Sequence, residues 1–325
     1  MKQGQIISLE NKVKNEYGNI AGIVVFKDDH CVYENYFNQC SEKEPVHIFS
    51  VTKSVISMLL GIALDKGCIK NIDEKVIDFF PNYQIGKREK TIQHITIRNL
   101  LTMTAPYKYK LNPYPKFFSS EDWVLSSLDF LGGRGKIGNF RYAPIIGMDI
   151  LSGILINTTG QSVLKFAQDN LFSPLEISVD KNIYFQSKEE QMDFYRSKGA
   201  NGWVADSNGT NTAGWGLSLT TMDMAKLGQL YLNGGCWNGR RIISGKWIAE
   251  STQVQSVWKA RDLKYGYLWW IIDEAEHSFA ALGDGGNAIY VNPENRTVAA
   301  VSSLFVKRAK DRVDFIRDEM EPLFR

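Results

Sequence analysis

The 325-residue sequence contains little cysteine and little histidine, with four residues of each. The cysteines are widely spread and form no Cys-x-x-Cys pair, which argues against a disulfide scaffold and favours free thiols in a reducing compartment. The histidines form no His-x-x-x-His or comparable pair, so we expect no catalytic zinc. The eight residues are Cys31, Cys40, Cys68, Cys236, His30, His47, His94 and His277.

Long apolar runs and basic clusters are also missing. Nowhere do 18 apolar residues follow one another, so no membrane span is predicted. Residues 1–8 carry a lysine with no long apolar run behind it, so they do not form a signal peptide. We therefore expect a cytoplasmic protein, although a chain trimmed of a leader would look the same. With a formal net charge of +2 and no basic block, nucleic-acid binding is not expected.

The composition that remains is that of an ordinary globular protein. It is 44% hydrophobic and 23% charged, which is enough for a large core in one or two domains. Strand patterns lie near both ends of the chain and helix patterns fill the middle. We therefore expect an α/β (α+β) fold: an antiparallel sheet built from both termini, flanked by helices, with an inserted mainly helical region. The predicted domains are residues 1–65 with 210–325, and residues 66–209.

Hydrophobic periodicity, caps and turn residues give the individual elements. The predicted helices are 5–16, 51–65, 97–102, 144–158, 162–171, 221–232, one capped by Ser244, and 307–324. The predicted strands are 22–26, 31–37, 265–272, 278–282, 288–292 and 297–303. Residues 105–119 form a long irregular segment rich in proline and aromatics, typical either of a lid or binding loop or of a packed surface loop.

Ser50 and Lys53 lie three residues apart at the start of the apolar stretch Val55 to Leu64. In a helix, residues at this spacing share a face, so the hydroxyl and the amine would meet at the mouth of a buried helix. Serine is a poor nucleophile until a base takes its proton, and a lysine can be that base only when it is neutral. Lowering the lysine pKa from about 10.4 to roughly 7–8 costs about 3–5 kcal/mol, so the site must be well buried.

The Ser-x-x-Lys spacing alone is weak, because it occurs four times in the chain. The other pairs are Ser162/Lys165, Ser178/Lys181 and Ser256/Lys259. Ser162 has the position of a helix cap, and the other two serines lie in polar or irregular surroundings. Only Ser50 opens an apolar helix. A helix N-cap is an alternative role for Ser50, and one serine can serve both purposes.

Other candidates are weaker when taken singly. No Gly-x-Ser-x-Gly is present, so a nucleophile elbow is not predicted. Tyr142 precedes an apolar helix and could shuttle a proton at the edge of a cleft, but with 14 tyrosines in the chain a structural role is the simpler interpretation. Gly283–Gly286 joins two predicted strands and indicates either close approach of a ligand or an ordinary turn. His277 precedes a strand that could line the site, although a surface position is simpler.

Together, the order and spacing of these segments resemble the serine β-lactamase and penicillin-binding protein superfamily. The resemblance covers nearly the whole chain and is strongest for the branch of class C-type β-lactamases, serine esterases, D-amino-acid peptidases and 6-aminohexanoate-dimer hydrolases. The segments that carry it are 49–54, 94–104, Tyr142 with 147–153 and 159–160, 213–225, 265–270 and 283–287, the last in the place of the family's third motif.

The resemblance implies a role for each residue. Ser50 would be the nucleophile that carries the acyl group, Lys53 its base, and Tyr142 the relay that protonates the leaving group and then activates water. The backbone N–H groups of Ser50 and Asn287 would form the oxyanion hole, where losing one donor costs on the order of 3 kcal/mol. The surrounding substrate-binding segment would be Asp284, Gly285, Gly286 and Asn287. Neither a metal nor an organic cofactor is implied.

Two departures from the family pattern bear on the substrate. Pro144 stands where the family often has Asn or Ser, so a usual contact to the substrate amide is missing. Asp284 stands where many members have a Lys or His that helps bind the carboxylate of penicillins and D-Ala-D-Ala peptides. Like charges at about 4 Å repel by roughly 4 kcal/mol near a protein surface. We therefore expect a small-molecule ester or amide that is neutral or carries an amine, rather than a β-lactam.

Two alternatives remain open at this point. The first is a true β-lactamase or DD-peptidase/carboxypeptidase. The second is a non-catalytic ligand-binding or sensor protein on the same fold, against which the intact Ser50, Lys53 and Tyr142 set argues. Several aromatic residues suggest an apolar pocket wall, although most tryptophans simply fill cores. These are Tyr107, Tyr109, Phe117, Trp215 and Trp270. The sequence carries no signal for an oligomeric state.

Overall fold

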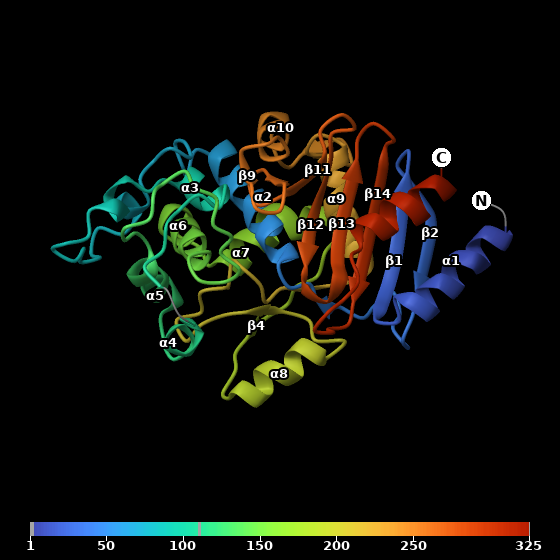
Figure 1. The fold of residues 1–325 in the computed structure, drawn as a ribbon, viewed down its shortest axis with the longest axis horizontal. Helices are drawn as coiled ribbons and strands as arrows, with labels where there is room; N and C mark the ends of the chain where they lie inside the picture. Colours follow the sequence, from blue (N-terminus) through green and yellow to red (C-terminus); the bar gives the residue numbers. More distant parts are fainter. Residues whose placement is uncertain (1–2, 110–111, 325) are drawn as a thin grey trace.

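The computed structural model describes residues 3–109 and 112–324, and its centre is one eight-stranded antiparallel sheet. The strand order is β2 (His30–Tyr36), β1 (Ile20–Lys27), β14 (Thr297–Ser303), β13 (Asn287–Asn292), β12 (Ser278–Gly283), β11 (Trp270–Asp273), β10 (Leu263–Tyr265) and β9 (Ser256–Trp258). Strand β1 from the start of the chain pairs with β14 from its end (Figure 1). The prediction of an antiparallel sheet built from both termini is therefore confirmed.

Helices cover both faces of the sheet, as the alternating side chains of its strands require. In β1, Val24 belongs to the large core shared with the helices α2 (Val51–Asp65) and α9 (Thr221–Leu232). Its neighbours Ile23 and Val25 belong to a second core, shared with the helix α1 (Gln3–Glu16) and the C-terminal segment η6 (Phe315–Met320). Figure 1 shows these two layers on opposite sides of the strands.

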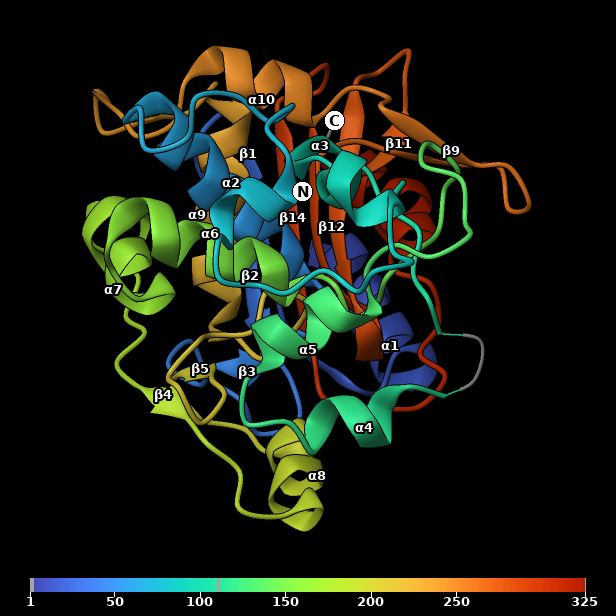
Figure 2. The same cartoon turned by 90° about the vertical axis from the view of Figure 1, so that its left-hand side faces the viewer.

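The remaining helices gather at one side of the sheet and form the helical half of the molecule (Figure 2). They are α3 (Ile97–Leu101), α4 (Tyr114–Phe118), α5 (Trp123–Phe130), α6 (Asp149–Thr159), α7 (Val163–Ala167), α8 (Lys188–Arg196) and α10 (Gly245–Ser251). Shorter strand pairs are β3 (Val46–His47) with β6 (Ser218–Leu219), β4 (Asn182–Ile183) with β5 (Trp203–Val204), and β7 (Cys236–Trp237) with β8 (Arg240–Arg241). The domain boundaries given above stay a prediction.

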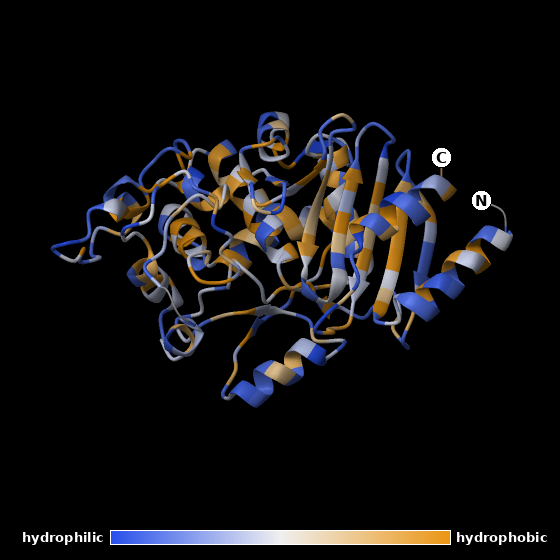
Figure 3. Cartoon of the chain, in the orientation of Figure 1, coloured by the Kyte–Doolittle hydropathy of each residue, from blue (hydrophilic) through white to orange (hydrophobic). Residues whose placement is uncertain are grey.

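Helix α2 lies between the sheet and the helical half, where it contacts both β12 and α6. Its residues from Val51 to Ala63 are all buried, and the helix is mainly hydrophobic after its first turn, which carries Thr52, Lys53 and Ser54 (Figure 3). It ends before Gly67, whose φ of 72° is a left-handed conformation that glycine adopts without strain. The predicted buried helix behind Ser50 is therefore confirmed.

Four predicted segments differ in the structure. The strand predicted for 265–272 is broken at 266–269, because the N–H groups of Tyr267 and Leu268 bond to carbonyls outside the sheet, at Ser251 and Leu101 respectively. The helix predicted from 144 begins only at 149. The helix predicted from 307 begins at 313, so residues 307–312 form a loop. In the loop predicted for 105–119, residues 114–118 form α4, and residues 110–111 lie outside the described residues.

Candidate active site

The side chains of Ser50 and Lys53 meet at the N-terminal end of α2. Lys53 Nζ lies 2.8 Å from Ser50 Oγ. Ser50 occupies the N-cap position, but its side chain makes no capping hydrogen bond, so the alternative role as a cap is not supported. The preceding residue, Phe49, has a φ of 49°, which is uncommon for a bulky side chain and is of the kind found next to functional groups. The hydroxyl is thus available for chemistry with the amine.

Two backbone carbonyls hold the Lys53 amine from the other side. Lys53 Nζ donates to Pro144 O at 2.7 Å and to Gly214 O at 2.8 Å. A carbonyl oxygen can only accept, so each of these contacts uses one N–H of the amine. A neutral amine has two N–H bonds and one lone pair. With both N–H bonds engaged, the lone pair of neutral Lys53 is left for Ser50 Oγ, which is the geometry a base needs.

Burial also favours the neutral form of Lys53. The side chain is 1% exposed, and removal from water lowers its pKa from 10.5 to about 7. The nearby carboxylates of Asp284 and Asp149 act in the opposite direction and limit this fall. The shift corresponds to about 5 kcal/mol of lost preference for the charged form. At neutral pH a large fraction of Lys53 is therefore able to accept a proton.

Tyr142 completes the group around the Ser50 hydroxyl. Lys53 Nζ lies 5.4 Å from the centre of its ring. Burial raises the pKa of Tyr142 to about 12, and the nearby Ser50 hydroxyl acts to lower it. Tyr142 consequently keeps its proton at neutral pH, as a donor to a leaving group must. The structure brings the three predicted catalytic residues together.

The segment after β12 packs directly against the start of α2. A methyl group added at Gly283 would lie 2.2 Å from Ile48 O and 3.2 Å from the backbone nitrogen of Ser50. Only a residue without a side chain allows this approach. The backbone N–H groups of Ser50 and of Asp284, the residue after Gly283, therefore lie at this contact. Two such groups close to a nucleophile are suited to binding a developing oxyanion.

The side chain of Asn287 binds the backbone of this turn. It is 1% exposed, and its amide donates to Asp284 O at 2.8 Å. Its Oδ1 accepts from the N–H of Ser303 at 2.9 Å. Asn287 therefore holds the 284–286 turn against β14. Gly285 and Gly286 lie in the same turn, with φ of 79° and 92°.

An open cavity of about 880 Å³ lies in front of Ser50 and is large enough for a small-molecule substrate. Tyr142, Trp258, Trp270, Gly283 and Asp284 line it with Ser50. The rings of Tyr142 and Trp258 are stacked, with centroids 6.3 Å apart. The cavity therefore combines an aromatic wall with the Asp284 carboxylate near the nucleophile.

Comparison with known proteins gives the family of this chain. A family model described as Beta-lactamase matches residues 11–319. The chain belongs to the Beta-lactamase family. The recognition made from the sequence motifs is confirmed, and so is the expectation of a β-lactamase-related hydrolase.

Two relatives by sequence and one solved structure are similar to this chain. An uncharacterized protein of Alkalihalophilus pseudofirmus is 26% identical over 304 residues, covering 86% of this chain and 82% of the relative. The 6-aminohexanoate-dimer hydrolase of Paenarthrobacter ureafaciens is 20% identical over 273 residues, covering 77% of this chain and 64% of the relative. The crystal structure of a family VIII carboxylesterase superposes with a TM-score of 0.75 at 14% identity, covering 98% and 96% of the two chains. The last likeness shows the fold alone.

Asp149 and His47 support the site by binding nearby backbone, and the sequence patterns did not predict either of them. Asp149 Oδ1 accepts from Ala213 N at 2.8 Å, and His47 Nε2 accepts from Gly216 N at 2.9 Å. Both side chains are buried, and together they fix the segment that contains the Gly214 carbonyl. A carboxylate at the start of an apolar helix was the available signal for Asp149. Burial lowers the pKa of His47 to about 3, so it stays neutral.

Two other sequence candidates lie away from Ser50. His277 is exposed at the end of β12 opposite to Gly283, so the suggestion that it serves the site is wrong. Ser162 caps α7 by accepting from Lys165 N, as predicted.

The aromatic residues expected to form a pocket wall have different positions. Trp270 lines the cavity of Ser50. Tyr107, Phe117 and Trp215 are buried in the cores, and Tyr109 is partly buried against them. The expected aromatic wall therefore exists at Ser50, but most of the residues suggested for it fill the interior instead.

Residues 3–109 and 112–324 contain no cluster of three or more His, Cys, Asp or Glu side chains that could hold a metal ion. Within the same ranges, none of the helices has the length and apolar character needed to cross a bilayer.

Proposed function

We propose that this chain hydrolyses a small-molecule ester or amide through an acyl-enzyme on Ser50. The single observation that carries the proposal is the set of three contacts of Lys53 Nζ. The carbonyl oxygens of Pro144 and Gly214 accept its two N–H bonds, which leaves the lone pair of the neutral amine for Ser50 Oγ. A structural lysine at this place would need a counter-charge rather than a lowered pKa and a serine partner.

In the first half-reaction, Ser50 Oγ attacks the substrate carbonyl carbon while Lys53 takes the hydroxyl proton. The bond from that carbon to the leaving oxygen or nitrogen then breaks, and Tyr142 supplies a proton to the leaving group. Lys53 returns its proton to Tyr142, which restores both residues. In the second half-reaction, water attacks the acyl carbon and gives a proton to the Lys53–Tyr142 pair. The bond from the acyl carbon to Ser50 Oγ then breaks, and the pair returns a proton to Ser50 Oγ.

For the oxyanion hole we propose the N–H groups of Ser50 and Asp284, in place of the Ser50 and Asn287 pair expected from the motif. Gly283, the residue before Asp284, lies against the Ser50 backbone nitrogen. Asp284 lines the cavity of Ser50, whereas the buried Asn287 supports the turn through its side-chain amide. Each donor of this kind typically contributes about 3–4 kcal/mol to the transition state.

The substrate we propose is neutral or carries an amine and is not a penicillin. Asp284 adds a carboxylate to the cavity near the nucleophile, and an anionic substrate would be repelled by roughly 1–4 kcal/mol at contact distance, with the lower value applying where the cavity is open to water. Pro144 offers no side-chain donor, and its carbonyl oxygen is occupied by Lys53. An amine-bearing ester or amide would instead be attracted by Asp284.

The test treats the protein with a fluorophosphonate, with nitrocefin and with p-nitrophenyl acetate, and follows intact mass and product release. We expect one fluorophosphonate adduct and ester turnover, both lost in Ser50→Ala. Ser178→Ala is the matched control, because Ser178 belongs to another Ser-x-x-Lys pair and is exposed. This control should behave as the wild type.

The other outcomes identify the alternatives. Efficient nitrocefin turnover would replace the proposal with a β-lactamase or DD-peptidase. Absence of an adduct with every probe would favour a binding or sensor protein. Labelling that persists in Ser50→Ala would remove Ser50 as the nucleophile.

A further inference from the structure

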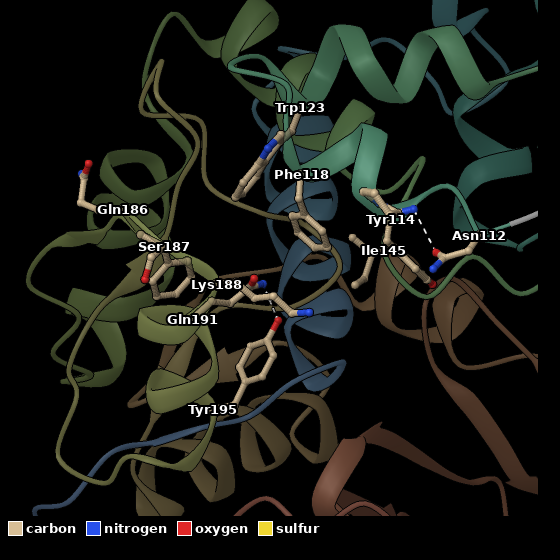
Figure 4. A pocket seen from close by; sticks show the side chains of 12 residues that line it. Asn112, Tyr114, Phe118, Trp123, Ile145, Gln186, Ser187, Lys188, Gln191 and Tyr195 are labelled. Carbon is tan, nitrogen blue, oxygen red and sulfur yellow. Dashed lines mark hydrogen bonds between the residues drawn. The ribbon is translucent and has the colours of Figure 1, made fainter.

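A second cavity, here called the aromatic pocket, lies between α4 and α8 and measures about 660 Å³. Its apolar wall consists of Tyr114, Phe118, Trp123, Ile145, Phe185 and Tyr195 (Figure 4). Gln186, Ser187, Lys188 and Gln191 add polar side chains to its lining, and Lys188 is the one charged residue among the described residues that line it. The interior therefore suits an uncharged, bulky apolar group.

The wall is pre-arranged by ring contacts behind it. Trp215, which is 3% exposed, lies edge-to-face with Phe118 at 6.0 Å and with Tyr195 at 5.5 Å. The Tyr195 hydroxyl accepts a hydrogen bond from Gln191 Nε2 at 2.7 Å, as the dashed line near α8 in Figure 4 shows. Rings held in this way lose little conformational entropy when another ring binds between them.

The aromatic pocket begins next to the catalytic residues. Ile145 directly follows Pro144, whose carbonyl oxygen accepts from Lys53. The Tyr195 ring packs against Phe49, the residue before Ser50, with centroids 5.5 Å apart. The carboxylate of Asp284 acts electrostatically on Tyr195 as well as on Lys53. These contacts connect the wall of the aromatic pocket to the segments that hold Ser50 and Lys53.

The position of Tyr142 decides which half of the substrate enters the aromatic pocket. Tyr142, the proton donor to the leaving group in the proposed reaction, lines the other cavity with Trp258 and Trp270. The leaving group must depart toward its proton donor. Tyr142 is not among the described residues that line the aromatic pocket, so this pocket is left for the part of the substrate that stays on Ser50.

We propose that the aromatic pocket binds the acyl half of the substrate, and that this half carries an aryl or similarly bulky apolar group. The inference rests on the proposed function. It adds the chemical class of the acyl group and assigns α4 and α8 to substrate selection.

The experiment compares p-nitrophenyl phenylacetate with p-nitrophenyl acetate, which share a leaving group and differ only in the acyl half. The wild type should show a kcat/KM at least about 10-fold higher for the phenylacetyl ester, in the range that one apolar pocket discriminates. Phe118→Ala should reduce this ratio about 10-fold while acetate turnover stays within about two-fold. Phe118→Leu, which keeps most of the volume, should give an intermediate ratio and guards against a folding defect.

Tyr184→Ala is the control, because Tyr184 precedes Phe185 in the chain but is 50% exposed and outside the aromatic pocket. Its selectivity ratio should equal that of the wild type. Acetate turnover with no preference for the phenylacetyl ester, or an unchanged ratio in both Phe118 variants, would overturn the inference and leave the proposed function intact. Absence of turnover of either ester would overturn both.

Discussion

Asp149 holds Ala213 in place, and through it the Gly214 carbonyl that accepts from Lys53, the proposed base. Asp149 Oδ1 accepts from the Ala213 N–H at 2.8 Å, and the next residue, Gly214, accepts from Lys53 Nζ at 2.8 Å. Burial raises the pKa of Asp149 to about 7. A buried carboxyl with an elevated pKa next to a buried lysine with a lowered pKa indicates a site organised around proton position.

Replacing Asp149 should therefore impair the base without touching the substrate. Asp149→Ala removes the acceptor of the Ala213 N–H, and we expect kcat/KM for a neutral ester to fall by about 10–100-fold. Asp149→Asn keeps an acceptor and should lose less than about five-fold. In both variants the rising limb of the pH profile should move to lower pH, because Asp149 raises the pKa of Lys53. Asp223→Asn, a buried carboxylate that caps α9, is the control. Wild-type profiles in both Asp149 variants would contradict this role.

The pH dependence of the wild type should report the titration of Lys53. Its pKa is lowered to about 7 by burial, and only the neutral amine can take the Ser50 proton. The kcat/KM for a neutral ester should therefore rise with pH through about 7 and reach a plateau above about 8. Tyr142, with a pKa raised to about 12, stays protonated across this range. A profile that is flat or falls between about pH 6 and 8 would contradict Lys53 as the base.

Gly283→Ala should damage the oxyanion hole through a steric clash. The added methyl group would lie 2.2 Å from Ile48 O, so β12 or the start of α2 must move. We expect kcat/KM to fall by about 100-fold or more and the protein to lose about 1–3 kcal/mol of stability. Gly86→Ala is the control, since nothing lies within 4 Å of its added methyl group. Kinetics and urea unfolding measure both effects, and wild-type kcat/KM in Gly283→Ala would disprove the close-packed arrangement.

Asp284→Asn should change both the preference for charged substrates and the pKa of Lys53. The variant loses the carboxylate that raises the pKa of Lys53, so its rising pH limb should shift to lower pH. Its kcat/KM for an amine-bearing ester, relative to a neutral ester of similar size, should fall by about 3–10-fold. The difference should shrink with added salt, because the cavity is open to solvent. An unchanged charge preference would show that Asp284 does not select the substrate.

Local patterns in the chain are enough to predict the buried helix behind Ser50, the caps of several helices and the strands near both termini. The patterns are an apolar run of helical length, alternating strand residues, and Ser or Thr before a helix. They also suffice to place a serine and a lysine on one helical face. The fold brings the Ser-x-x-Lys pair that is backed by an apolar helix to a cavity.

How Lys53 is held, and what surrounds it, depends on contacts between distant segments. The carbonyls of Pro144 and Gly214 come from segments 91 and 161 residues away. Every residue has a backbone carbonyl, so the pattern of side chains does not indicate which carbonyls accept from Lys53. Long-range contacts likewise interrupt the strand predicted for 265–272, where the backbone bonds to Ser251 and Leu101. A local pattern describes one segment at a time, whereas the burial of Lys53 and its hydrogen bonds to distant carbonyls exist only after those segments have packed together.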